Sequence, residues 1–91
     1  MAGTVIALDR QFSTENRFHA AAETEVAIVN SNRKDDAIFW IESSTSAAVP
    51  TAKPTEELTP IIPNEKFRMT LAAGEYVYFV GDPRYKALVI Q

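Results

Sequence analysis

An all-β fold is predicted by this sequence: a small antiparallel β-sandwich of about seven short strands, with at most one short helix. Apolar and polar residues alternate in several short runs, which is typical of strands with one buried face. Turn-forming residues separate these runs, and 91 residues suffice for one hydrophobic core. We therefore expect a single domain over residues 1–91.

The last third of the chain has the clearest strand pattern. Phe67, Met69 and Leu71 alternate with polar neighbours. Gly74 interrupts the pattern, and we expect it to adopt a positive φ, which glycine reaches at little cost. Gly, Asp and Pro make residues 81–84 a further turn. The strands predicted in this region span residues 66–71, 75–80 and 86–91. Their tight connections predict an antiparallel meander.

The first half of the chain adds further short strands. They are predicted over residues 4–8, 17–21, 25–30 and 37–42. Residues 15–23 are rich in alanine, so two turns of helix are an alternative there, although so short a helix is marginal. Residues 31–36 contain no apolar side chain and predict a solvated loop. We expect this loop to join its two flanking strands as a hairpin.

Residues 43–63 differ in composition from the rest. They are rich in Ser, Thr and Ala, and they contain Pro50, Pro54, Pro60 and Pro63. Proline removes a ladder donor and favours extended backbone at the preceding residue. This stretch therefore predicts a long loop or arm, with a possible edge strand over residues 58–62.

The sequence contains few residues of the kinds that form catalytic or metal-binding sites. The chain has one histidine, His19, and no cysteine, so no metal site is expected. The paired acids Asp35-Asp36 and Glu56-Glu57 lie in polar stretches and are more simply solvated loops. The three glycines lie far apart and form no phosphate loop. We expect no catalytic residue, no cofactor and no enzymatic activity.

Charge and hydropathy narrow the class of partner. The formal net charge of -3 argues against nucleic-acid binding, which usually requires a basic stripe. No apolar run is long enough to cross a bilayer, so no membrane is expected. The first four residues lack the basic start of a signal peptide.

The aromatic side chains allow two interpretations. A flat platform for sugar stacking could be formed by Phe39, Trp40, Tyr76, Tyr78, Phe79 and Tyr85. The favoured interpretation places Trp40 and Phe79 in the core and the tyrosines on the sheet surface with their hydroxyls outward.

Several predicted strands are apolar on both faces, which is unusual for a sandwich exposed to water on one side of each sheet. Ile38 and Trp40 oppose Phe39 and Ile41, for example. Either residues 43–63 fold back over the second face, or another chain covers it. We expect a partner or a homo-oligomer. The candidate interface residues are Phe39, Ile41, Val29, Val49, Leu58, Tyr76 and Tyr78.

The order of these signals resembles a family of virion proteins. The phrases that carry the resemblance are residues 26–32, 37–41, 60–65, 71–78 and 87–90. Together they resemble the small β-sandwich accessory proteins of tailed bacteriophages, found as capsid decoration (cement) proteins and as neck or tail components. The resemblance covers roughly residues 24–91, while residues 10–23 do not align with it.

The resemblance implies a non-enzymatic structural protein, made in the host cytoplasm and carried in the virion in many copies. We expect a decoration protein that binds the major capsid protein or another virion protein. A neck or tail accessory protein, a carbohydrate-binding module and a small adaptor of a host protein remain as alternatives.

Overall fold

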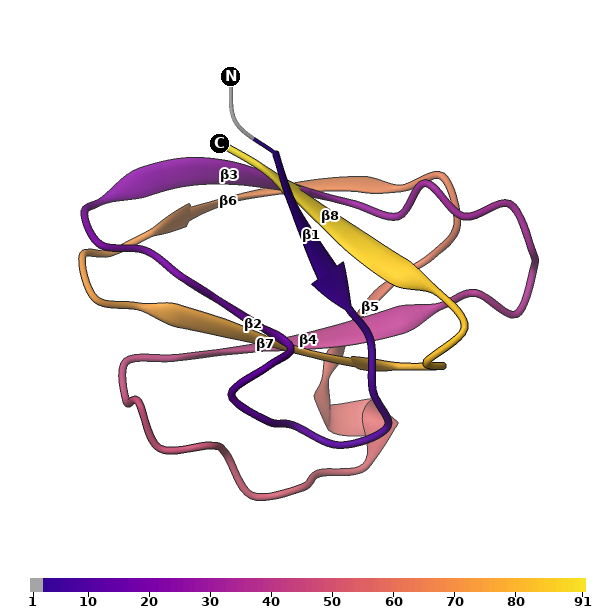
Figure 1. Ribbon diagram of the computed structural model, residues 1–91, viewed down its shortest axis with the longest axis horizontal. Helices are drawn as coiled ribbons and strands as arrows, with labels where there is room; N and C mark the ends of the chain where they lie inside the picture. Colours follow the sequence, from indigo (N-terminus) through magenta and orange to yellow (C-terminus); the bar gives the residue numbers. More distant parts are fainter. Residues whose placement is uncertain (1–2) are drawn as a thin grey trace.

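The computed structural model describes residues 3–91 as two four-stranded antiparallel sheets (Figure 1). The predicted all-β sandwich is thus confirmed, with eight strands where about seven were expected. The strands are β1 (Gly3–Ala7), β2 (Arg17–His19), β3 (Thr24–Val29), β4 (Phe39–Ser44), β5 (Thr59–Ile61), β6 (Lys66–Leu71), β7 (Tyr76–Gly81) and β8 (Lys86–Ile90). A single 3₁₀ turn, Thr55–Glu57, precedes β5.

The strand order is that of a jelly roll. Sheet A has the order β1-β8-β3-β6 and sheet B the order β2-β7-β4-β5. The first strand therefore pairs with the last, the second with the seventh, the third with the sixth and the fourth with the fifth. This nested pairing, folded into two sheets, is the double-sheet arrangement of a jelly roll, with β1 and β6 at the edges of sheet A and β2 and β5 at the edges of sheet B.

The predicted meander and the predicted hairpin are both wrong. Strands β5 to β8 follow one another through four-residue turns, but each turn crosses from one sheet to the other. The crossing is possible because the two layers of a sandwich lie only about 10 Å apart. Likewise, β3 pairs with β6 and β8, while β4 pairs with β5 and β7.

These three four-residue turns, which we call corners, share one hydrogen-bond pattern. In each, the backbone amide at the fourth turn position donates to the carbonyl at the first: Glu65 to Ile62 (3.1 Å), Glu75 to Ala72 (3.0 Å) and Tyr85 to Asp82 (3.0 Å). In the first two corners the glutamate carboxylate also accepts the amide of that first residue. The chain thus turns sharply enough to change sheets without losing backbone hydrogen bonds.

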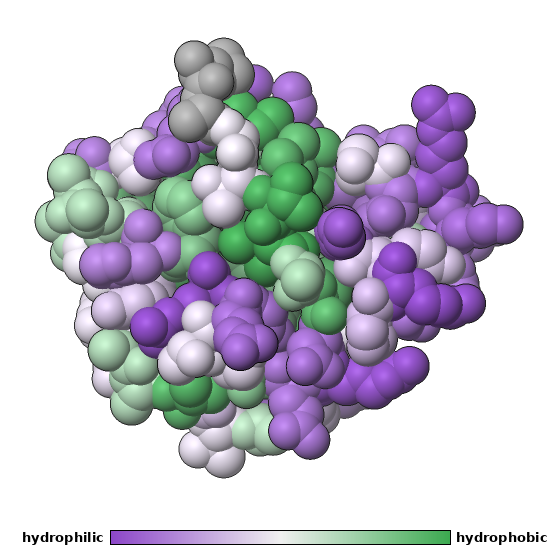
Figure 2. Space-filling view, in the orientation of Figure 1, coloured by the Kyte–Doolittle hydropathy of each residue, from purple (hydrophilic) through white to green (hydrophobic). Residues whose placement is uncertain are grey.

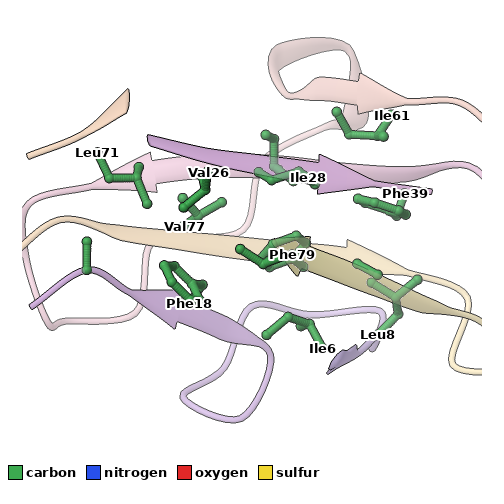
Figure 3. Packing of buried hydrophobic residues seen from close by; sticks show 14 residues of the cluster. Ile6, Leu8, Phe18, Val26, Ile28, Phe39, Ile61, Leu71, Val77 and Phe79 are labelled. Atoms are coloured by element: carbon green, nitrogen blue, oxygen red, sulfur yellow. The ribbon is translucent and has the colours of Figure 1, made fainter. Parts of the chain in front are cut away.

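The hydrophobic core lies between the sheets (Figure 3). Alternate residues of each strand point inward, as the period of two requires. Phe39 and Phe79 meet at its centre, with ring centres 5.9 Å apart. The inward set also includes Ile6, Phe18, Val26, Ile28, Ile41, Ile61, Leu71, Val77 and Val89. The prediction for Phe79 is therefore confirmed, whereas that for Trp40 is wrong, since Trp40 is half-buried on the outer face of sheet B.

Gly74 and Gly81 are needed for different structural reasons. Gly74 has φ 84°, as predicted, and a Cβ there would have no neighbour within 4 Å. Gly81 was expected to serve the turn, but it is the last residue of β7. A Cβ at Gly81 would lie 2.9 Å from the Cβ of Phe39, so its role is to allow close strand packing.

The predicted loops lie where expected. Residues 31–36 connect β3 to β4 across the end of the sandwich, and β5 forms an edge of sheet B. Residues 45–54 form a long loop between β4 and the 3₁₀ turn. Residues 3–91 contain no helix long and apolar enough to cross a membrane.

Candidate functional site

The outer face of sheet A is built from the residues that alternate with the core. Strand register places Val5 opposite Leu88, and Leu88 opposite Val29. The same face carries Ile90 opposite Ala27. Apolar side chains therefore run without interruption across β1, β8 and β3. Figure 2 shows part of this surface in green, over β1 and β8.

We call this set the sheet A face; it comprises Val5, Ala27, Val29, Leu88 and Ile90. Val5 is 62% exposed, which is unusual for so large an apolar side chain in a strand. Val29, Leu88 and Ile90 are half-buried. The face is therefore apolar, and it is most open to solvent at Val5 on the edge strand β1.

Basic side chains border the sheet A face. Lys66 stands opposite Val29, and Arg68 opposite Ala27, on the neighbouring edge strand β6. Lys86 stands opposite Ala7 at the start of β8. A shallow groove of about 270 Å³ runs between Lys66, Arg68 and Ile90. Glu25 lines the same groove, so this border carries three basic side chains and one acidic side chain.

The outer face of sheet B is covered by the chain itself. Residues 45–54 and 9–16 both lie beyond this sheet, at the bottom of Figure 1. Arg17 Nη1 donates to the carbonyl of Ala47 (3.1 Å) and to Tyr78 Oη (3.2 Å). Tyr78 is fully buried although it points away from the core. Of the two alternatives for covering the second face, the fold-back of residues 43–63 therefore applies to this sheet.

Further contacts fasten these segments. The rings of Phe12 and Tyr78 form a T-shaped pair with their centres 6.1 Å apart. Lys53 forms an ion pair with Glu42 on β4, and this contact raises the pKa of Lys53. The loop is therefore held at both its beginning and its end.

A stack of rings and one guanidinium continues along β2 and β7. The His19 ring stacks on Tyr76 with centres 4.3 Å apart. The guanidinium carbon of Arg17 lies 4.6 Å from the ring centre of Tyr76 and 5.9 Å from that of Tyr78. His19 is exposed, and its ring packs on one side of the stack through Tyr76.

The predicted interface residues do not come together. Phe39 and Ile41 belong to the core, and Leu58 and Tyr78 are buried within the chain. Val49 is 41% exposed in the long loop. Tyr76 is half-buried on sheet B, and Val29 lies on the sheet A face. Whether Val29, Val49 and Tyr76 contact a partner stays a prediction.

Sequence reasoning missed Val5, Leu88 and Ile90 as surface residues. The available signal was the alternation itself: once Ala87 and Val89 are assigned to the core, Leu88 and Ile90 must point outward. The alternative of one flat aromatic platform does not hold, because Phe39 and Phe79 are internal and Tyr85 lies in the last corner.

Within residues 3–91, no three His, Asp or Glu side chains lie close enough together to hold a metal ion. No protein-family model, curated protein or solved structure matches this chain. The resemblance to bacteriophage accessory proteins therefore stays a prediction.

Proposed function

We propose that this protein is a non-enzymatic structural protein of a tailed-bacteriophage virion, and that it decorates the capsid by docking the sheet A face on the coat lattice. The supporting observation is the contrast between the two outer faces. Sheet B is covered over most of its outer face by the chain's own loops, whereas the apolar outer face of sheet A is open at its edge strand β1, where Val5 is 62% exposed. A second protein surface is the natural cover for such a face.

The size of the face favours more than one contact per copy. Four strands about 4.8 Å apart, with about six residues of 3.4 Å each, give the whole outer surface of sheet A, basic border included, an area of roughly 400 Å². One side of a standard interface buries about 800 Å². The outer surface of sheet A supplies at most about half of this, so a stably bound copy touches further neighbours. Val49 and Ile62, which are 41% and 53% exposed, are candidates for the additional contacts.

The apolar and basic residues of the face indicate what kind of partner surface would fit it. An apolar patch with an acidic rim complements the apolar centre and the basic border of Lys66, Arg68 and Lys86. The major capsid protein, or another virion protein at the neck or tail, is the proposed partner, and multiple copies or a homo-oligomer follow from a repeating lattice. Jelly rolls also serve in unrelated roles, so the fold by itself does not carry this proposal.

The proposal is tested by binding to purified particles. Val5→Glu places a charge in the open face without disturbing the core, and Leu88→Glu does the same one strand away. Thr45→Glu adds the same charge on the exposed loop beyond sheet B and serves as the matched control. Co-sedimentation should show retained binding for the control and loss for both face variants, all with unchanged circular dichroism.

Salt and stoichiometry provide independent readouts. Arg68→Glu should weaken binding more at about 0.1 M salt than at about 1 M, where charges are screened beyond about 3 Å. The number of copies per native particle should match a lattice repeat. Wild-type binding by both Val5→Glu and Leu88→Glu, or a monomer absent from intact particles, would contradict the proposal.

A further inference from the structure

A second hollow lies on the opposite side of the molecule, where the loops leave one end of sheet B uncovered. Its volume is about 320 Å³, and its floor is formed by Ile38, Trp40 and Val80. Trp40 stands opposite Val80 on β7 and opposite Pro60 on β5. The indole is half-buried, so part of the ring remains open to a ligand.

Charged side chains line the rim of this hollow. They are Arg10, Asp36 and Asp82, which come from three different loops. Arg84 fixes the two carboxylates: its Nη2 donates to Asp82 Oδ2 at 2.7 Å and to Asp36 Oδ2 at 3.2 Å. The hydroxyl of Tyr85 donates to the other oxygen of Asp36 at 3.0 Å. Acceptor oxygens are thus held beside an apolar floor.

The charges within this group balance. Arg10 and Arg84 offset Asp36 and Asp82, so an added ion would find no net opposite charge. The hydrogen bond from Arg84 also lowers the pKa of Asp82 to about 2, which keeps this carboxylate an acceptor at neutral pH. A fitting ligand is therefore neutral, with one apolar face and several hydroxyl groups.

We infer that this hollow binds one ring of a neutral saccharide. The carbon-bound hydrogens of a pyranose ring would lie on the indole of Trp40. Its hydroxyls would donate to Asp36 and Asp82 and accept from Arg10. The volume is at the lower end of the roughly 300–1,000 Å³ typical of ligand sites, which suits a single ring. This site lies on sheet B, whereas the docking face proposed above lies on sheet A.

Trp40 is the single tryptophan of the chain, so its fluorescence reports directly on the hollow. The protein is titrated with glucose, galactose, mannose and N-acetylglucosamine, and with their oligosaccharides. At least one of these should produce a saturable change in Trp40 emission. Tetramethylammonium chloride and sodium acetate, as cationic and anionic probes, should produce none.

Variants then locate the binding. Asp36→Asn and Arg10→Ala should each weaken the saccharide about tenfold, corresponding to loss of one charge-assisted hydrogen bond of roughly 1.4 kcal/mol. Glu56→Gln removes an exposed carboxylate on the nearby 3₁₀ turn, outside the hollow, and should leave the affinity unchanged. Circular dichroism confirms that each variant is folded.

Three results would overturn the inference. The first is the absence of any saturable fluorescence change with every saccharide of the panel. The second is saturation by the cation or the anion alone, which would assign another ligand class. The third is a loss in Glu56→Gln equal to that in Asp36→Asn, which would place the ligand elsewhere.

Discussion

The side-chain amide of Asn30 donates a hydrogen bond to the carbonyl of Ile61, 2.9 Å away, and so ties the end of β3 in sheet A to β5 in sheet B. The same amide nitrogen donates to the carbonyl of Ala37 at 2.7 Å, while its oxygen accepts from the side chain of Asn32. Asn30 is fully buried. One polar side chain therefore links both sheets at the end where the chain changes layers.

Asn30→Asp should be strongly destabilising. The substitution keeps the shape but turns the donor nitrogen into an acceptor that faces two carbonyl oxygens. We expect a loss of about 3 kcal/mol, because buried groups left without partners cost about 1–3 kcal/mol and charged ones more. Urea unfolding measures the change. Gln11→Glu makes the same amide-to-acid change at an exposed site, so it is the control and should stay within about 0.5 kcal/mol of wild type. Equal effects at both sites would disprove the linking role of Asn30.

Phe79→Ala and Trp40→Ala should differ in their loss of stability, because the two side chains lie on opposite faces of sheet B. Phe79 is fully buried in the core, so its truncation should cost about 3–5 kcal/mol. Trp40 is half-buried on the outer face, and its truncation should cost about half as much. Thermal and urea unfolding of both variants check the order. A larger loss of unfolding free energy for Trp40→Ala than for Phe79→Ala would indicate that the indole lies in the core.

Gly74→Ala should cost about 1–2 kcal/mol through backbone strain alone. The residue has φ 84°, while a Cβ would meet nothing within 4 Å, so steric overlap does not contribute. Gly74→Asn should recover part of the loss, since asparagine tolerates the left-handed region better than alanine. Denaturant midpoints distinguish the variants. If both substitutions were neutral, this corner would not retain its positive φ in solution.

Acid should weaken the last corner through Asp82. Its hydrogen bonds to Arg84 lower the pKa from 3.8 to about 2. Because the folded-state pKa lies below the ordinary value, the carboxylate stabilises the fold above about pH 4, and this contribution is lost as the pH falls toward 2. An NMR titration should find the low pKa in the wild type and a value nearer 3.8 in Arg84→Gln. Arg33→Gln removes the same charge from an exposed loop and should leave Asp82 unchanged.

Strand positions were predictable because the alternation of apolar residues is local. Each observed strand overlaps a predicted one, including the short β2. Strand partners were not predictable in the same way. A four-residue turn suits a hairpin and also suits a corner between layers, so residues 62–65, 72–75 and 82–85 do not show which sheet follows.

For a related reason, the sequence does not show which side chains of β4 point into the core. Phe39 and Trp40 are both large and apolar, and a period of two does not say which of them is inside. Gly81 decides it in the structure, because its missing side chain admits the Cβ of Phe39. The hollow at Trp40 could not be predicted, since Arg10, Asp36 and Asp82 meet there only after the jelly roll has formed.

The position of β8 affects the synthesis of this protein. β8 lies in the middle of sheet A, hydrogen-bonded to β1 on one side and to β3 on the other. Since every other strand precedes it in the chain, residues 86–90 must have left the ribosome before sheet A can close. Until then, β1 lacks its pairing strand and β3 is paired only with β6, along one edge. A stalled or truncated chain ending before Lys86 would therefore expose unpaired strands, and it would be a substrate for chaperones or proteases rather than a smaller version of the fold.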